Sequence, residues 1–207
     1  MLFPLPQVAD AIRRNVLLGS SGIGIAAAYG LACGARKLED IGFEEEWNRM
    51  CANMAATRPT APDLFRCIEA MKREVSEHRG THPALLEALT MRADELQSAR
   101  MALDSAISDQ ADRFIKSGVR PPASLAPLFA LCTRVHSTPT CFRLQDKILL
   151  HGSTGALATG GFGVSLGAIK CAKANGKAVS IVIAEARPDM SGGRVAAYEA
   201  LKGCATA

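Results

Sequence analysis

The sequence predicts an α/β protein: a helical N-terminal domain followed by a truncated Rossmann-like parallel α/β segment. Three observations support this fold class. The first half of the chain repeats apolar residues at helical spacing. Two short apolar runs, 147–150 and 178–184, are typical of buried strands. The glycine-rich stretch 151–167 joins the first of these strands to a helix, as happens at ligand sites of open parallel sheets.

Four helices are expected in the first 80 residues. Three of them cover residues 7–17, 23–37 and 43–54, and the second is apolar nearly all round, which indicates burial on every side. The fourth is expected to begin with Thr60 as its N-cap and Pro62 in its first turn. Its buried residues should lie three and four apart, at Leu64, Ile68, Met71 and Val75.

Residues 83–116 are expected to form one or two amphipathic helices with Leu96, Leu103, Ile107 and Phe114 on the buried side. Residues 117–146 contain four prolines and no sustained periodicity, which indicates an irregular connection or an insertion. We therefore expect a helical N-terminal domain over residues 1–116. After the connection at 117–146, an incomplete Rossmann-like domain is expected over residues 147–207.

The α/β segment should contain a helix over residues 168–176, ended by an Asn-Gly pair, and another from 191 to 204. Ligands of open parallel sheets meet the carboxyl ends of the strands, where glycines and helix N-termini offer free N–H groups. A ligand should therefore meet residues 151–163 and 184–194. Because parallel sheets need both faces covered, two strands suggest that another chain supplies strands or that the fold is incomplete.

Composition narrows the function classes. The net charge of +4 is scattered, without a Lys/Arg block or interleaved aromatics, so we expect no nucleic-acid partner. The seven cysteines are widely spaced, with no C-x-x-C pair and no nearby His at metal-ligand spacing. They are interpreted as reduced thiols of a cytoplasmic protein, and no metal site is expected.

Two uncharged runs, 16–35 and 148–169, are about 20 residues long, the length that spans a bilayer. Both are rich in Gly and Ser and lack the aromatic belts of membrane helices. The first six residues also lack the basic start and cleavage site of a signal peptide. We expect a soluble chain with no membrane partner.

The glycine-rich stretch is not a dinucleotide fingerprint. Gly161, Gly163 and Gly167 are spaced G-x-G-x-x-x-G, and no acidic residue follows the second strand in the expected ribose-binding register. We therefore expect no cofactor. The small residues of this stretch are equally consistent with close packing of a helix on a strand.

Arg58 lies in a loop just before the helix that starts near Pro62. A guanidinium beside free helix N–H groups is a good anion site, particularly for phosphate. The alternative is an ion pair between Arg58 and a neighbouring carboxylate, since structural ion pairs also use such arginines. The loop alone leaves both interpretations open.

Several collinear stretches resemble the methylthioribose-1-phosphate isomerase family. They are Gly19 with 23–30 (IGIAAAYG), 57–61 (TRPTA) with Leu64-Phe65, 154–163 (TGALATGGFG), 185–188 (EARP) and 192–194 (GGR). The resemblance covers nearly the whole chain. It implies a helical domain followed by a Rossmann-like domain, usually in a homodimer. The regulatory subunits of translation initiation factor 2B are similar in fold and do no chemistry.

The family's enzymes interconvert methylthioribose 1-phosphate and methylthioribulose 1-phosphate, a step of methionine salvage. The resemblance implies that a cysteine following the His of the glycine-rich strand end and an aspartate on a later strand move the proton between C1 and C2. Here Gly152 stands where that cysteine belongs, and Ser153 where an Asn is usual. The chain ends before the segment expected to carry the aspartate. No catalytic residue is therefore predicted.

The resemblance implies a partly retained phosphate site. Its Arg-Gly-Ala-Pro motif is replaced by Leu18-Gly19-Ser20-Ser21, and Ser191 replaces a substrate-binding glutamine. Arg58 matches a phosphate-contacting arginine, and Gly19 with Ser20 can still donate backbone N–H groups. The predicted substrate-binding residues are thus Gly19, Ser20 and Arg58, and the predicted ligand is a sugar phosphate.

His151 and Ser153 are poor replacements for the missing thiol. Neighbouring residues of a strand point to opposite faces, so neither side chain should share the position of Gly152. Losing a positioned acid or base costs about 10²–10⁴-fold in rate. Three alternatives follow: an isomerase-like protein of weak or no activity; a non-catalytic regulatory subunit in a homodimer or hetero-oligomer; or a diverged product without a stable fold.

Overall fold

The computed structural model describes residues 5–115, 146–187 and 189–204. Its first part is helical: α1 (Leu5–Arg13), α2 (Ser20–Ala35), α3 (Phe43–Ala55), α4 (Pro62–Glu77) and α5 (His82–Asp112). The second part contains β1 (Asp146–Leu150), α7 (Ala156–Thr159), α8 (Ser165–Ala174), β2 (Val179–Ile183), the π-helical turn η3 (Gly192–Ala196) and α9 (Ala197–Cys204). The described chain is therefore mostly helical, with a two-stranded parallel sheet. The connection predicted over 117–146 lies almost entirely outside the described residues.

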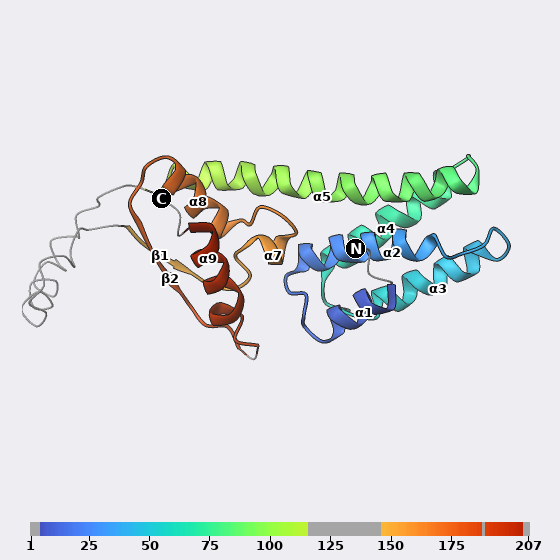
Figure 1. Ribbon diagram of the computed structural model, residues 1–207, viewed down its shortest axis with the longest axis horizontal. Helices are drawn as coiled ribbons and strands as arrows, with labels where there is room; N and C mark the ends of the chain where they lie inside the picture. Colours follow the sequence, from blue (N-terminus) through green and yellow to red (C-terminus); the bar gives the residue numbers. More distant parts are fainter. Residues whose placement is uncertain (1–4, 116–145, 188, 205–207) are drawn as a thin grey trace, which may run out of the picture.

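The long helix α5 links the two parts of the molecule. Figure 1 shows α5 running along one side, above α2, α3 and α4 at one end and beside α8 at the other. It contacts α2, α4 and α8. The helical group and the α/β group thus both pack against the same helix.

Helix α2 is the centre of the helical group, as its apolar sequence predicts. Its side chains from Ile23 to Ala35 contribute to one apolar core with α1, α3, α4 and the first half of α5. Gly24 is needed there because a Cβ at this position would lie 2.7 Å from the carbonyl oxygen of Asp63. The small residues of α2 therefore let α4 pack closely against it.

Helix α4 begins with Pro62 as predicted, but the predicted N-cap is wrong. Ala61 is the N-cap and makes no side-chain capping bond, while Thr60 is exposed. The N–H of Asp63 instead donates to Oγ of Ser20 at 3.3 Å, so a serine from the start of α2 caps α4. The capping residue is therefore close to α4 in space but distant in sequence, so the local sequence does not reveal it.

The buried face of α4 is as predicted at Leu64, Ile68 and Met71, with Val75 partly buried. The α5 prediction is wrong about the buried side. Three of the four residues predicted to be buried are exposed, namely Leu103 (51%), Ile107 (40%) and Phe114 (84%). The buried residues are apolar near the start of α5 and polar near its end: Leu85, Leu89 and Ala93, then Asp104, Ser108 and Asp112.

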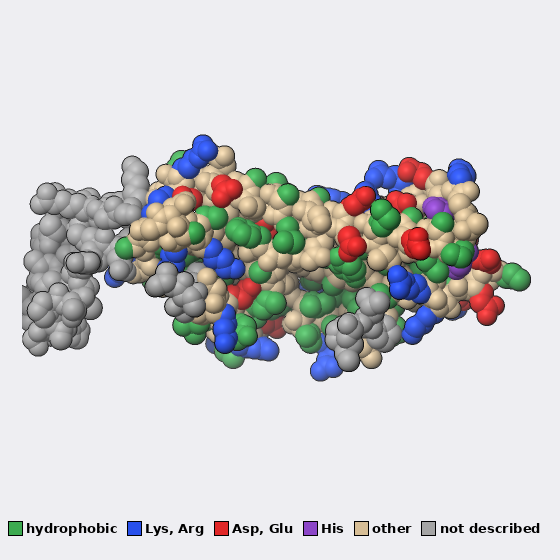
Figure 2. Space-filling model, turned by 45° about the horizontal axis from the view of Figure 1, so that its top comes forward, with side chains coloured by type: hydrophobic (Ala, Val, Ile, Leu, Met, Phe, Trp, Pro, Cys, Tyr) green, Lys and Arg blue, Asp and Glu red, His purple; other side chains and the backbone are tan. Residues whose placement is uncertain are grey.

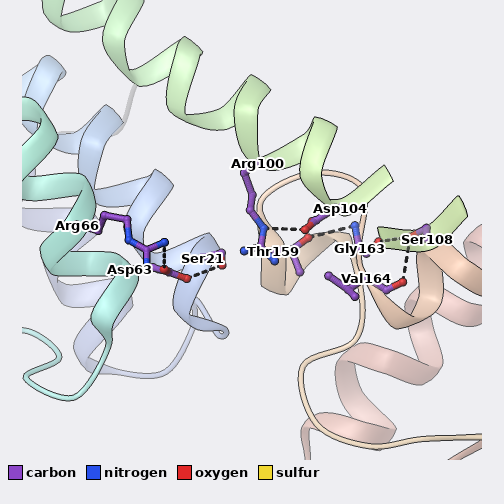
Figure 3. Close-up of polar contacts among 9 residues, drawn as sticks. All are labelled: Ser21, Asp63, Arg66, Arg100, Asp104, Ser108, Thr159, Gly163 and Val164. Carbon is purple, nitrogen blue, oxygen red and sulfur yellow. Dashed lines mark hydrogen bonds and ion pairs between the residues drawn. The ribbon is translucent and has the colours of Figure 1, made fainter. Parts of the chain in front are cut away.

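The polar end of α5 holds the α/β group. Ser108 Oγ donates to the carbonyl oxygens of Gly163 (3.3 Å) and Val164 (3.1 Å) in the glycine-rich stretch. Asp112 accepts hydrogen bonds of 2.8 Å from Nζ of Lys177 and from Nδ2 of Asn175. Figure 3 shows Ser108 pointing at this stretch, with Asp104 beside Nε of Arg100 at 2.7 Å. Hydrogen bonds and the ion pair between Asp112 and Lys177 therefore help to attach the second part, beside close contacts such as that of Gly161 with the Met101 side chain.

The sheet pairs β1 and β2 in parallel, from Asp146 opposite Val179 to Leu150 opposite Ile183. One small apolar cluster, centred on Leu150, Leu166 and Ile169, packs α8 and α9 against it. Leu149 (66%) and Val182 (50%) are exposed, because no described element covers their side of the sheet. In the described residues, no helix is both long enough and apolar enough to cross a bilayer.

Exposed apolar side chains also lie along the outer side of α5. Figure 2 turns the molecule and shows hydrophobic side chains over its middle, with charged groups toward both ends. Met91 is 63% exposed, whereas Leu103, although 51% exposed, lines a cavity with Ile25 of α2 and Cys67 of α4. The apolar residues that suggested a buried face in the sequence are thus largely at the surface of the described structure.

Candidate functional site

A small cavity lies between three segments. These are the glycine-rich turn that follows β1, helix α7, and the segment formed by η3 and α9. The volume of the cavity is about 10 Å³, close to the minimum for one water molecule. The lining residues are Leu18, Gly152, Ser153, Thr154, Ala158, Ser191, Val195, Ala196 and Glu199. The structure therefore brings together Leu18, Gly152, Ser153 and Ser191, four of the positions at which the sequence differs from the isomerase pattern.

The backbone at Gly152 explains one wrong prediction. Strand β1 ends at Leu150, and Gly152 has φ +81°, a left-handed conformation that favours glycine. The alternation of a strand therefore does not extend to this position, and Ser153 lines the same cavity as Gly152 rather than the opposite face. No atom lies within 4 Å of where a Cβ of residue 152 would be.

His151 lies elsewhere. Its side chain is exposed and belongs to a larger, open cavity of about 590 Å³ beside β1, together with Lys147 and Phe114. Among the described residues, the cavity beside Gly152 contains neither an imidazole nor a thiol. Its titratable lining residue is Glu199.

Glu199 was missed by the sequence analysis. It is 9% exposed, and its Oε1 accepts the backbone N–H of Leu157 at 2.8 Å. Its Oε2 has no hydrogen-bond partner among the described residues, nor has Oγ1 of Thr154, which is 3% exposed. A Cβ at Gly155 would overlap Oε2, so any other residue there would displace the carboxylate of Glu199. Only the fold places this helical glutamate against the turn.

Glu185 occupies the backbone N–H groups that a ligand was expected to use. Its carboxylate accepts hydrogen bonds from the amides of Ala186 (2.8 Å), Gly192 (2.8 Å) and Gly193 (3.1 Å). The hydrogen bond from Ala186, with those from Gly193 and Gly192, lowers the pKa of Glu185. These three amides are therefore satisfied by an internal carboxylate, and the contact of a ligand with residues 184–194 stays a prediction. Glu185 lies two residues after the end of β2, and the sequence analysis named it only as part of the 185–188 stretch.

The predicted phosphate-binding residues lie around the starts of α2 and α4. Gly19 is the N-cap of α2, with φ +86°, and a Cβ there would overlap the carbonyl group of Ala158 in α7. Ser20 Oγ is bonded to the Asp63 amide, as described above. Ser21 Oγ donates to Oδ2 of Asp63 at 2.6 Å, which Figure 3 also shows. These contacts set the starts of α2 and α4 side by side.

Arg58 lies in the turn before α4 and is partly buried. Its carbonyl oxygen accepts the N–H of Ala61 at 3.2 Å. Within the described part of the chain, its guanidinium has no ion-pair or hydrogen-bond partner, so the neighbouring carboxylate weighed as an alternative is not found there. Arg58 does not line the cavity beside Gly152. Its role in binding phosphate stays a prediction.

Metal ligands and reactive thiols do not gather at this site. Across residues 5–115, 146–187 and 189–204, no group of three or more His, Cys, Asp or Glu side chains is arranged to hold a metal ion. Cys51 and Cys67 belong to the helical core, and burial raises the pKa of each thiol to about 11. Both are therefore protonated near neutral pH, as expected of inert buried cysteines.

Comparison with known proteins decides the family. The model of the initiation factor 2 subunit family matches residues 16–204. This chain belongs to the initiation factor 2 subunit family. The match extends from the end of α1 to α9 and so includes the cavity beside Gly152 and the starts of α2 and α4.

Two curated relatives are named methylthioribose-1-phosphate isomerase. That of Syntrophotalea carbinolica is 36% identical over 195 residues, 93% of this chain and 49% of the relative. That of Geobacter sulfurreducens is 35% identical over 200 residues, 95% of this chain and 50% of the relative. The chain thus spans about half the length of the curated relatives it matches.

Solved structures share the fold. The delta subunit of translation initiation factor eIF-2B from A. fulgidus superposes with a TM-score of 0.74 at 23% identity, covering 96% of this chain and 51% of that one. The 5-methylthioribose 1-phosphate isomerase from Pyrococcus horikoshii OT3 gives 0.75 at 21% identity, covering 97% and 49%. An isomerase and an initiation factor subunit are thus similarly close, and fold alone does not choose between their functions.

Proposed function

We propose that this chain is an isomerase-like sugar-phosphate-binding protein with weak or no isomerase activity. The site would take a sugar 1-phosphate such as methylthioribose 1-phosphate, the compound named in its relatives. Gly19, Ser20 and Arg58 would bind the phosphate, and the described α/β part would correspond to an incomplete Rossmann-like domain over residues 147–207. No cofactor is needed for this function.

The observation that carries the proposal is the composition of the cavity beside Gly152. The family resemblance puts a cysteine at residue 152, and a proton shuttle requires an acid or base within hydrogen-bond reach of the reacting carbon. Glycine supplies neither. The side chain of Ser153 reaches the same cavity, but an ordinary serine hydroxyl is a weak acid, and no described base contacts it.

Binding is supported by the starts of two helices and by Arg58. Helices α2 and α4 begin side by side, and the first backbone N–H groups of a helix, together with its dipole, favour an anion. The guanidinium of Arg58 lies just before α4 and has no partner among the described residues. A phosphate there would gain a charge-assisted hydrogen bond.

A regulatory role in a homodimer or hetero-oligomer is the second candidate. Gly152 also favours this role, because a subunit that only binds a sugar phosphate does not need a proton shuttle. Turnover and binding separate the two candidates, since a regulatory subunit can bind a sugar phosphate without converting it. A sedimentation or light-scattering measurement would give the oligomeric state.

The test combines both measurements on the purified chain with methylthioribose 1-phosphate. We expect thermal stabilisation by the sugar phosphate and no conversion detectable by NMR. Arg58→Ala should abolish the stabilisation, and Arg73→Ala, an exposed arginine of α4, should retain it. Turnover near ordinary kcat values of about 1–10³ s⁻¹ would contradict the impaired site. Absence of stabilisation, or of a cooperative unfolding transition, would contradict a folded binding protein.

A further inference from the structure

The cavity beside Gly152 contains two buried oxygen atoms that nothing in the described structure satisfies. They are Oε2 of Glu199 and Oγ1 of Thr154, on side chains that are 9% and 3% exposed. Buried polar atoms are nearly always hydrogen-bonded, because leaving one unpaired costs about 1–3 kcal/mol. Both residues line the same cavity. A partner for both atoms would therefore have to sit in that space.

The size and charge of the cavity restrict the partner. A volume of about 10 Å³ accepts one oxygen atom and excludes a phosphate group. The carboxyl oxygen of Glu199 accepts hydrogen bonds, while the threonine hydroxyl can donate as well as accept. A hydroxyl group matches both, since it can donate to Oε2 of Glu199 and accept from Oγ1 of Thr154.

Other contacts hold this arrangement in place. Oε1 of Glu199 is fixed by the N–H of Leu157, which directs the other oxygen toward Gly155 and the cavity. Leu18, the neighbour of Gly19, lines the same cavity, so the start of α2 adjoins it. A ligand whose phosphate lies at the start of α2 would have its hydroxyl groups near this cavity.

We propose that Glu199 and Thr154 form a hydroxyl subsite, which binds one ring hydroxyl of the sugar phosphate. This inference rests on the proposed function, because the phosphate would be bound by Arg58 and the start of α2. It adds a determinant of specificity: the site selects ligands that carry a hydroxyl at one position. A deoxy sugar would leave the buried carboxylate oxygen unpaired.

The test measures affinity by calorimetry for ribose 1-phosphate, its 2-deoxy and 3-deoxy analogues, and inorganic phosphate. Wild-type chain should bind one deoxy analogue about tenfold or more weakly, the effect of one hydrogen bond to a charged group. Thr154→Val and Glu199→Gln should reduce this ratio to about twofold or less, while the affinity for inorganic phosphate stays unchanged. Glutamine keeps an oxygen for the Leu157 N–H, and Thr90→Val on α5 is the matched control that should keep the full ratio.

The outcomes separate this inference from the proposed function. Ribose 1-phosphate binding without a deoxy effect, or with a deoxy effect unchanged in both variants, overturns the hydroxyl subsite and leaves sugar-phosphate binding standing. Variants that change only the melting temperature indicate an internal water in the cavity and also overturn it. Failure of ribose 1-phosphate and methylthioribose 1-phosphate to bind would remove the proposed function, and the subsite with it. Circular dichroism shows whether each variant is folded. If Glu199→Gln is not folded, the deoxy effect in Thr154→Val alone tests the hydroxyl subsite.

Discussion

The helical part and the α/β part are stabilised in different ways. The helical part has an extensive apolar core drawn from five helices, whereas the α/β part has a small cluster centred on three buried residues, Leu150, Leu166 and Ile169. Helix α5 serves both, with Leu85 and Leu89 in the core at one end and Ser108 and Asp112 bonded to the α/β part at the other. One part can be stable through its own core, while the other depends on specific polar contacts.

The largest effect should come from the apolar end of α5. Leu89→Ala removes a fully buried side chain and should destabilise the chain by about 2–5 kcal/mol, through lost burial and the cavity left behind. Urea unfolding followed by circular dichroism measures this loss. Leu103→Ala, on the same helix but 51% exposed, should change stability far less. Equal losses would mean that Leu103 is as fully buried in solution as Leu89.

The polar end of α5 offers the complementary experiment. Asp112→Ala should remove the carboxylate that accepts from Lys177 and Asn175, leaving Lys177 only the backbone carbonyl oxygen of residue 112, and speed amide exchange in α8 and β2 by about 10- to 100-fold. Amides of α2 and α4 should keep their protection. Gln110→Ala, an exposed neighbour on α5, serves as the control. Equal acceleration in both parts would show that they unfold as a single unit, in contrast to the division drawn above.

Two glycines of α2 test how closely the helical part is packed. Gly24→Ala should destabilise by about 1–3 kcal/mol, since its Cβ would press on the carbonyl oxygen of Asp63, which belongs to the backbone. At Gly30 the nearest atoms belong to the Val8 side chain, 3.3 Å away. Gly30→Ala should therefore stay within about 1 kcal/mol of wild type, because helix propensity offsets the crowding. Thermal melts of both variants measure the two losses of stability. A Gly24→Ala variant as stable as Gly30→Ala would refute the packing argument.

Acid should weaken the α/β part before the helical part. The hydrogen bond from Lys177 lowers the pKa of Asp112 from its ordinary value of 3.8, so the folded chain binds this proton less readily than the unfolded chain. The stabilisation is complete above the ordinary value and is lost as the pH falls through it toward the lower folded value. Exchange protection of α8 should therefore decline below about pH 4, and Asp112→Asn should decline less. A wild-type profile parallel to that of Asp112→Asn would contradict this origin.

The helical part was largely predictable from the sequence, and its exceptions have a common cause. Local spacing predicted α2, α3 and the buried face of α4, because apolar burial there follows helical periodicity. It failed for α5, where the periodic apolar residues are exposed and Asp104, Ser108 and Asp112 are buried. It also failed at Thr60, whose capping role is taken by Ser20. In both cases the deciding partner is distant in the chain.

The candidate site was predictable only in part. The glycine-rich turn and the carboxyl ends of β1 and β2 were correctly placed, because strand–turn–helix patterns are local. The two carboxylates were missed, since Glu199 resembles any helical glutamate and Glu185 acts through the backbone amides that fold around it. The placement of Ser153 was wrong, because a strand pattern was extended past Leu150.

The left-handed backbone at Gly152 bears on whether a cysteine could be introduced at this position. Open space beside the residue would accommodate a thiol, but any side chain there must occupy a conformation that L-amino acids rarely adopt. The substitution Gly152→Cys alone would therefore either strain the backbone of the turn or change the conformation of the segment leading to Ser153. Placing a reactive side chain at this turn is therefore a problem of reshaping the main chain first and introducing the side chain second.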